Sequence, residues 1–341
     1  MALKRISLEN FTVFDKMEIE FSPGINVLIG ENGMGKTHIM KVLYSACQAA
    51  QAKTTALNFN QKLVRVFRPD NLRISRLVKR GGGAGTRASN IVVSTDDATL
   101  NMYFHSKSQG WEAEIKGEKS WEKQANSLVS TYIPSKEILS NAQKLPSAID
   151  QSVVAFDDTF KDIIQMASVG VLKGRERLSI NTYANILRTF GTLSVDVIDE
   201  TFYLKQGSNA KLEFNLVSEG IRKIALLWQL VKNGTFASGS VLFWDEPEAN
   251  INPKNIPVLI DILLALQKDG LQIFLATHDY FFAKFLEVRR TTSTELLYHA
   301  LHKKDDSVLC ESSSEFELLE NNSIIAQSIN LYKEEVAKVM G

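Results

Sequence analysis

A glycine-rich loop between an apolar segment and a helical segment constrains the fold of this chain more than any other feature. Residues 24–29 form an almost continuous apolar run, as in a buried parallel strand. Residues from Thr37 to about Ala56 have helical spacing and good helix formers. The loop that joins the two segments reads Gly30-Glu31-Asn32-Gly33-Met34-Gly35-Lys36-Thr37. This succession of strand, loop and helix predicts an α/β fold with a parallel sheet.

The same loop predicts a phosphate site, because it fits the pattern G-x-x-x-x-G-K-[ST]. Its glycines let backbone N–H groups surround phosphate oxygens without side-chain clashes. We expect Lys36 to contact the β- and γ-phosphates of a nucleotide, and the Thr37 hydroxyl to take a Mg²⁺ position. The positive end of the following helix points at the same phosphates. The predicted nucleotide-binding segment therefore comprises the eight loop residues and His38.

Two later apolar strands are expected to bring polar side chains to the same edge of the sheet. Residues 241–244 are apolar and precede Asp245 and Glu246, while residues 271–276 are apolar and lie just before His278. Ligands of open α/β sheets bind at the C-terminal ends of the strands. We predict that Asp245 holds Mg²⁺ through water and that Glu246 activates or positions the attacking water. His278 is expected to sense the γ-phosphate.

A third motif, Ser218-Glu219-Gly220, precedes an amphipathic apolar segment over residues 221–231. Ser218 is a favourable helix N-cap, and Gly220 permits close approach of another backbone. An ordinary helix start is the alternative interpretation of these three residues. Their place between the glycine-rich loop and the acidic strand favours a role for Ser218 and Gly220 in nucleotide binding.

Composition excludes several classes of protein. Lysine plus arginine and aspartate plus glutamate number 39 each in 341 residues, so no global field favours nucleic acid or membrane. Cys47 and Cys310 lack metal-ligand spacing and suit a reducing compartment. The N-terminus lacks the apolar core of a signal peptide, and no run reaches the roughly 18 apolar residues of a membrane span. These features predict a soluble cytoplasmic protein.

The chain divides into three predicted lobes. Residues 1–60 and 215–341 are expected to form the nucleotide-binding core, and residues 61–132 an inserted antiparallel β lobe. Residues 133–214 are expected to be mainly helical and to lead into the motif at Ser218. A basic stretch over residues 62–87 contains eight cations and one acidic residue, Asp70. The cations are Lys62, Arg65, Arg68, Arg73, Arg76, Lys79, Arg80 and Arg87. They could contact a nucleic-acid backbone, form a solvated face, or dock an acidic protein.

Taken together, the motifs resemble the ABC-type ATPase heads of the RecF, SMC and OLD branch. The resemblance rests on Ile6-x-Leu8-x-Asn10-Phe11, residues 24–33, Ser218-Glu219-Gly220, Asp245-Glu246-Pro247-Glu248 and residues 249–253. It implies that two heads sandwich two ATP molecules, each bound by the P-loop of one subunit and by Ser218 of the other. The helix after Gly220 would then direct its N-terminal dipole at the partner's γ-phosphate.

Some features depart from that branch. Glu219 stands where transporter-type heads carry a small residue, and residues 132–136 are the candidate for the glutamine loop. The gap between Lys36 and Ser218 is too short for the long coiled coil of SMC proteins, and the tail after His278 is too short for the nuclease domain of OLD proteins.

The motif set is similar to that of stand-alone ATPases of bacterial anti-phage defence systems, which work with a separate effector. It implies Mg²⁺-dependent ATP hydrolysis by a homodimer or a higher homo-oligomer that uses its nucleotide state as a switch. Two alternatives stay open. One is a DNA-repair ATPase of the RecF kind, and the other is a slow-turnover scaffold locked by ATP.

Overall fold

The computed structural model describes residues 2–51, 57–81, 85–124, 128–170 and 193–340. Among the described helices, none is long and apolar enough to cross a membrane.

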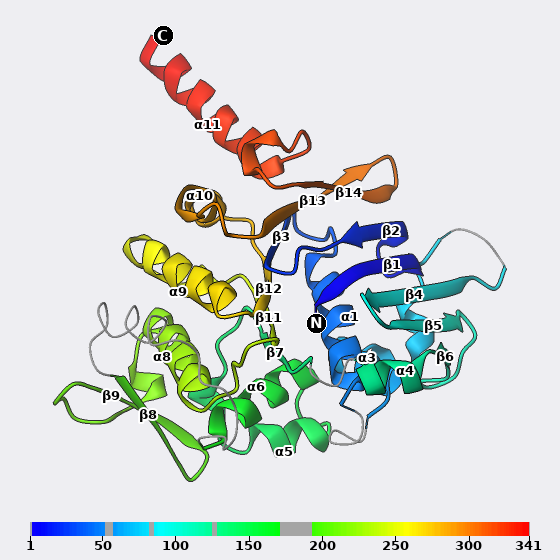
Figure 1. Cartoon of the computed structure of the whole chain (residues 1–341), viewed down its shortest axis with the longest axis horizontal. Helices are drawn as coiled ribbons and strands as arrows, with labels where there is room; N and C mark the ends of the chain where they lie inside the picture. The colour runs from blue at the N-terminus through cyan, green and yellow to red at the C-terminus, as the bar shows by residue number, and fades with distance from the viewer. Residues whose placement is uncertain (1, 52–56, 82–84, 125–127, 171–192, 341) are drawn as a thin grey trace.

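A six-stranded sheet forms the centre of the molecule (Figure 1). Five neighbouring strands run parallel, and only the edge strand β14 is antiparallel to its neighbour β13. The strands in sheet order are β14 (Ser307–Ser313), β13 (Leu296–Lys304), β3 (Ile25–Gly30), β12 (Gln272–Ala276), β11 (Val241–Asp245) and β7 (Ser130–Ile133). The parallel strand predicted before the glycine-rich loop is confirmed as β3, which is fully buried.

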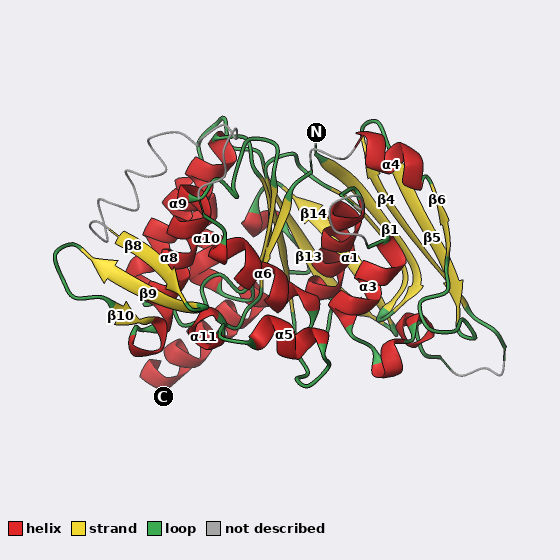
Figure 2. Cartoon of the chain, turned by 90° about the horizontal axis from the view of Figure 1, so that it is seen from below, coloured by secondary structure: helices red, strands yellow, loops and turns green. Residues whose placement is uncertain are grey.

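Hydrophobic cores lie on both faces of this sheet, because side chains alternate along each strand. Ile25, Val27 and Ile29 of β3 belong to one core, and Leu28 belongs to the other. Helices α8 (Glu219–Lys232), α9 (Ile256–Lys268) and α10 (Tyr280–Arg289) cover the first face. Helices α1 (Lys36–Ala49) and α3 (Phe59–Phe67) cover the second (Figure 2).

A five-stranded antiparallel sheet packs outside α1. Its order is β2 (Phe14–Glu20), β1 (Leu3–Phe11), β4 (Ala88–Thr95), β5 (Thr99–His105) and β6 (Glu114–Lys116). The predicted antiparallel lobe is therefore present, but two of its strands come from the first 20 residues. Conversely β7, near the end of the segment assigned to that lobe, joins the parallel sheet beside β11. Periodicity along the chain does not reveal such partners, because strand pairing is a non-local choice.

Seven further helices and strands complete the described fold. They are α4 (Glu118–Gln124), α5 (Leu145–Asp150), α6 (Asp158–Ser168), β8 (Leu193–Ile198), β9 (Thr201–Gln206), β10 (Leu212–Glu213) and α11 (Ser323–Met340). Of these, α4 lies on the antiparallel sheet, and α11 projects away from the body (Figure 1). Strands β8, β9 and β10 form a small antiparallel sheet before α8. Residues 171–192 of the lobe predicted to be mainly helical lie outside the described residues.

Candidate functional site

The glycine-rich loop lies between β3 and α1, as the motif predicts. Gly35 is the N-cap of α1 with φ +89°, and a Cβ there would lie 2.4 Å from the Phe14 ring, so the position requires glycine. Lys36 Nζ donates to the backbone carbonyls of Gly30 (2.7 Å) and Glu31 (3.0 Å). Burial lowers the pKa of Lys36, and Asp245 opposes that shift. The Lys36 side chain therefore folds back onto the start of its own loop, and residues 31–33 at the tip of the loop are exposed.

Asp245 and Thr37 meet at the C-terminal edge of the central sheet. The Thr37 hydroxyl donates to Asp245 Oδ2 at 2.9 Å, although 208 positions separate the two residues. Burial raises the pKa of Asp245, and the charge of Glu246 adds to this effect. A hydroxyl and a carboxylate beside a phosphate site are donors that suit Mg²⁺, which binds one or two protein oxygens together with substrate phosphates. The predicted metal position therefore fits the residues present.

Glu246 and His278 follow the adjacent parallel strands β11 and β12. Glu246 adopts φ +49°, and its backbone N–H donates to the carbonyl of Ala276 at 2.9 Å. The Glu246 carboxylate lies beside His278, whose Nδ1 is 3.3 Å from Glu246 Oε1. Both side chains are partly exposed, at 34% and 53% respectively. The structure thus brings the two residues together where water and a nucleotide can reach them.

Ser218 lies at the N-cap of α8, on the opposite face of the central sheet from α1. Its side chain is exposed and makes no capping hydrogen bond, so the hydroxyl does not serve the helix start. Gly220 packs against the loop after the acidic strand, and a Cβ at this position would lie 3.0 Å from the carbonyl oxygen of Asn250. The close approach expected of Gly220 therefore occurs within its own chain.

Lys223 is a residue of the site that no motif indicated. Its side chain is buried in α8, and its Nζ donates to the carbonyls of Ala249 (2.6 Å) and Glu246 (3.4 Å). Burial lowers the pKa of Lys223, while Glu219 and other nearby carboxylates oppose the shift. A lysine within the apolar segment 221–231 was the available signal, because lysines are rarely buried without partners. Lys223 links α8, the helix that follows the signature motif Ser218-Glu219-Gly220, to the loop that carries Glu246.

Glu248 lies behind the exposed acidic residues. Its Oε1 accepts a hydrogen bond from the Thr277 hydroxyl at 2.6 Å, immediately before His278. Burial raises the pKa of Glu248 from 4.5 to about 7, although this hydrogen bond acts in the opposite direction. Between pH 4.5 and about 7, the Glu248 carboxyl is therefore largely protonated in the folded nucleotide-free protein and largely ionised in the unfolded chain.

Stability of the nucleotide-free protein is accordingly expected to fall as pH rises from about 4.5 to about 7. Over that interval the folded state binds more protons than the unfolded state. The loss amounts to roughly 2–3 kcal/mol. Urea unfolding of wild type, Glu248→Gln and Glu320→Gln at several pH values measures it. Glu248→Gln should reduce the decline and the exposed control Glu320→Gln should retain it. An equal decline in all three proteins would contradict the assignment.

Three cations of the basic stretch form ion pairs or hydrogen bonds within the molecule. Lys62 on α3 is 3% exposed and pairs with Asp158 of α6 at 3.2 Å. Arg65 pairs with the same carboxylate at 2.7 Å, and Arg68 donates to backbone carbonyls of residues 154 and 156. These contacts hold α3 against α6. The suggestion that the whole stretch contacts nucleic acid is therefore corrected, because Lys62, Arg65 and Arg68 are engaged within the molecule.

Comparison with known families identifies the chain. The sequence model of a family described as "AAA domain, putative AbiEii toxin, Type IV TA system" matches residues 107–283, which is more than half of the chain. The chain belongs to this AAA family. A second model, described as an AAA ATPase domain, matches residues 1–79 of the same chain. Together the two matches include the glycine-rich loop, the signature segment and the acidic strand.

Curated relatives of this AAA protein include DNA replication and repair proteins RecF. That of Listeria welshimeri is 35% identical over 82 residues, which are 24% of this chain and 21% of the relative. That of Phocaeicola vulgatus is 48% identical over 52 residues, which are 15% and 14% of the two chains. The match therefore spans about a fifth or less of these relatives.

Solved structures with the same fold include SMC heads. The SMC head domain from Thermotoga maritima has a TM-score of 0.53 at 14% identity, covering 92% of this chain and all of the other. An SmcHead bound to the C-winged helix domain of ScpA has a TM-score of 0.59 at 13% identity, covering 92% and 98%. At such identities the likeness concerns the fold. The AAA chain thus has the fold of RecF/SMC-like ABC-type ATPase heads, as its motifs indicated.

Proposed function

We propose that this head hydrolyses ATP with Mg²⁺ as a dimer and that its nucleotide state controls a separate effector in anti-phage defence. The observation that carries the enzymatic part is the meeting of Lys36, Thr37 and Asp245 with Glu246 and His278 at one edge of the sheet. Five polar residues from three distant parts of the sequence converge there. Each matches one requirement of phosphoryl transfer, which depends on charge stabilisation and positioning.

In this proposal, the backbone of residues 30–37 and the ammonium of Lys36 hold the phosphates. Lys36 would exchange its two carbonyl partners for phosphate oxygens, which are stronger acceptors. Thr37 and Asp245 would hold Mg²⁺, which supplies charge neutralisation at the phosphates. Glu246 would orient and deprotonate the attacking water, and His278 would contact the γ-phosphate.

A second head would complete each ATP site. Ser218 is exposed and unengaged at the positive end of α8, whereas α1 and its P-loop pack on the other face of the sheet. A head with both halves on opposite faces suits a two-fold sandwich in which each P-loop faces the partner's Ser218. The fold shared with SMC heads supports this arrangement.

The effector and the defence role rest on family evidence. The matched family is described as a putative toxin of a type IV toxin–antitoxin system. A cytoplasmic location is part of the proposal, and the two unbonded cysteines suit such a reducing compartment.

ATP turnover per subunit, measured across protein concentration and paired with mass by light scattering, tests the proposal. We expect mass to increase with ATP and Mg²⁺, and specific activity to rise with concentration until the dimer saturates. Turnover that is independent of concentration in a protein that stays monomeric would overturn the dimer.

Two alternatives have distinguishing results. RecF-like repair is favoured by the partial identity to RecF proteins, and it requires ATP-dependent binding to DNA ends or gaps. An ATP-locked scaffold would show a stable ATP-bound complex with turnover far below about 1 per second, the lower range of typical enzymes.

A further inference from the structure

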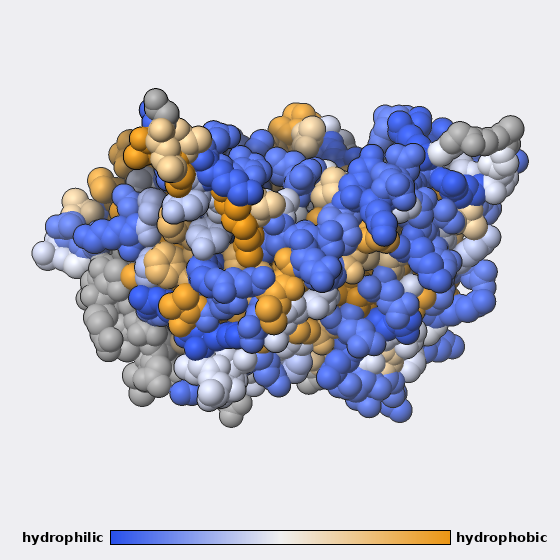
Figure 3. Space-filling model, turned by 90° about the horizontal axis from the view of Figure 1, so that it is seen from above, coloured by the Kyte–Doolittle hydropathy of each residue, from blue (hydrophilic) through white to orange (hydrophobic). Residues whose placement is uncertain are grey.

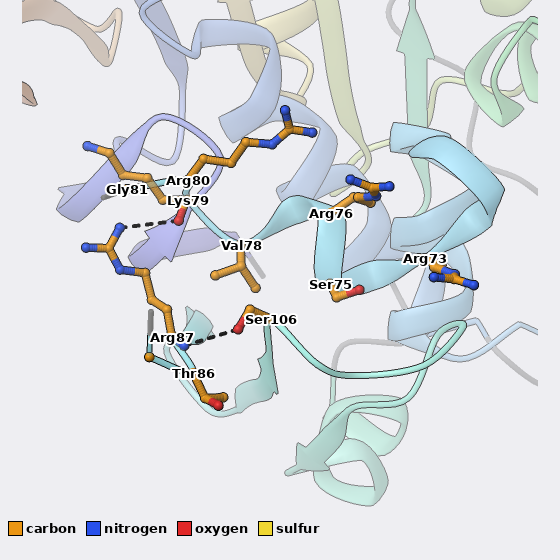
Figure 4. A pocket seen from close by; sticks show the side chains of 11 residues that line it. Arg73, Ser75, Arg76, Val78, Lys79, Arg80, Gly81, Thr86, Arg87 and Ser106 are labelled. Atoms are coloured by element: carbon orange, nitrogen blue, oxygen red, sulfur yellow. Dashed lines mark hydrogen bonds between the residues drawn. The ribbon is translucent and has the colours of Figure 1, made fainter. Parts of the chain in front are cut away.

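The later part of the basic stretch lines an open groove beside the antiparallel sheet. The groove has a volume of about 590 Å³. Its cations project from two short segments that both precede β4, and they point in several directions around the opening (Figure 4). The lining cations are Arg73, Arg76, Lys79, Arg80 and Arg87. Here this set is called the groove cations.

Carboxylates neutralise only part of the groove. Arg76 lies 3.5 Å from Asp70, with both side chains largely exposed, and Lys79 is paired with Asp15. In the described part of the chain, no carboxylate is bonded to Arg73 or Arg80, and both side chains are exposed. The groove therefore keeps a positive charge in a protein whose overall formal charge is zero.

A second cavity shares part of its lining with this groove and also borders the nucleotide-binding loop. It has a volume of about 540 Å³ and is lined by Gly33 and Met34 of the loop. Arg76, Lys79 and Arg80 line both cavities. The segment that carries these three cations thus borders both the groove and the cavity at the nucleotide loop.

Hydrogen bonds join the same segment to the start of α1. The backbone N–H of Lys79 donates to the carbonyl of Asn10 at 2.8 Å, and that of Thr12 donates to the carbonyl of Leu77 at 2.7 Å. The Thr12 hydroxyl in turn lies 3.0 Å from Nδ1 of His38, the residue after Thr37. Burial lowers the pKa of His38 to about 4, so the ring is neutral at physiological pH. Thr12 is thus hydrogen-bonded to both the groove segment and the P-loop helix.

We propose that the groove cations bind the phosphate backbone of duplex DNA and that this binding is coupled to the nucleotide site through Thr12 and His38. Arginines in an exposed strip are suited to backbone phosphates. The residues that line the groove include no aromatic side chain, and single strands are usually held by stacking on aromatic rings. Figure 3 shows a mostly hydrophilic surface on the antiparallel-sheet side of the molecule, which favours a charged ligand over an apolar partner.

A DNA-binding measurement without nucleotide tests whether the groove cations bind duplex DNA. Fluorescence anisotropy with a duplex of about 20 base pairs at several salt concentrations gives the affinity and its salt slope. Arg73→Gln/Arg80→Gln should weaken binding and reduce the slope by about 2. The exposed pair Lys119→Gln/Lys123→Gln on α4 undergoes the same change in charge and should bind like wild type. An unchanged slope in the Arg73/Arg80 variant, or equal affinity for a single strand of that length, would overturn the duplex site.

The coupling between the groove and the nucleotide site rests on the proposed ATP site. It is measured as the ratio of the ATP affinity with DNA to that without DNA. Coupling between two sites is reciprocal, so DNA should change ATP affinity by the factor by which ATP changes DNA affinity. We expect a factor of about five or more in wild type. Thr12→Val should bring the ratio close to one, and Thr12→Ser, which keeps the hydroxyl, should restore it. A ratio of one in wild type, or an unchanged ratio in Thr12→Val, would overturn the coupling. Failure of ATP to bind at all would refute the proposed function while leaving the DNA measurement valid.

Discussion

Replacing Glu246 with glutamine is expected to slow ATP hydrolysis by about 10²–10⁴-fold, the usual contribution of a general base. The amide keeps the shape of the side chain but cannot accept the proton of the attacking water. ATP affinity should stay within about threefold of wild type, since the phosphate cradle of Lys36 and Thr37 is untouched. The variant should therefore accumulate as an ATP-bound dimer.

Steady-state turnover, equilibrium ATP binding and mass by light scattering measure these three quantities. Glu320→Gln makes the same chemical change at an exposed position near α11 and should behave like wild type. Hydrolysis by Glu246→Gln at the wild-type rate would remove Glu246 from its proposed role. A mass that does not respond to ATP in this variant would contradict the sandwich.

Replacing Ser218 with arginine is expected to abolish turnover, to below about 1% of wild type, without preventing ATP binding to the monomer. The side chain of Ser218 is exposed and makes no capping bond, so the substitution leaves the packing of α8 intact. In the proposed sandwich, however, a bulky side chain at this position keeps the partner's γ-phosphate away from the start of the helix. The variant should remain monomeric with ATP and Mg²⁺.

A mixing experiment tests whether Ser218 acts across subunits. Ser218→Arg and Lys36→Ala should each be inactive, but a mixed dimer contains one site with an intact P-loop and an intact Ser218. Mixing them should therefore restore part of the turnover. No restoration, or loss of ATP binding in Ser218→Arg alone, would mean that the signature segment acts within its own subunit. Ser120→Arg on α4 controls for adding a surface arginine.

The nucleotide loop and the acidic strand were predictable because their information is local. The run of apolar residues before Gly30, the need for glycine at Gly35 and the lysine beside it all lie within one short segment. Asp245 and His278 could be placed because strands of a parallel sheet end at a common edge. Hence the α/β class and the relationship to ABC-type heads were evident from motif order, and the family comparisons confirm them.

For the basic stretch, the local sequence could not predict which cations are paired within the fold. Eight cations in one segment looked equivalent, yet Lys62 and Arg65 are paired with Asp158, almost a hundred positions away. No sequence pattern connects those positions, because the pairing depends on how α3 packs against α6. Lys223 was overlooked for a similar reason, since its partners are backbone carbonyls of a loop that composition does not distinguish.

The sequence by itself determined the phosphate-binding loop, the order of the motifs and the parallel strands that carry them, since each depends on the chemistry of neighbouring residues. Only the tertiary structure decided that β1 and β2 join the antiparallel sheet, that three cations are consumed in packing, and that Thr12 contacts His38. These outcomes depend on which segments, distant in the chain, bury their apolar surface together, and that choice is made by the whole fold.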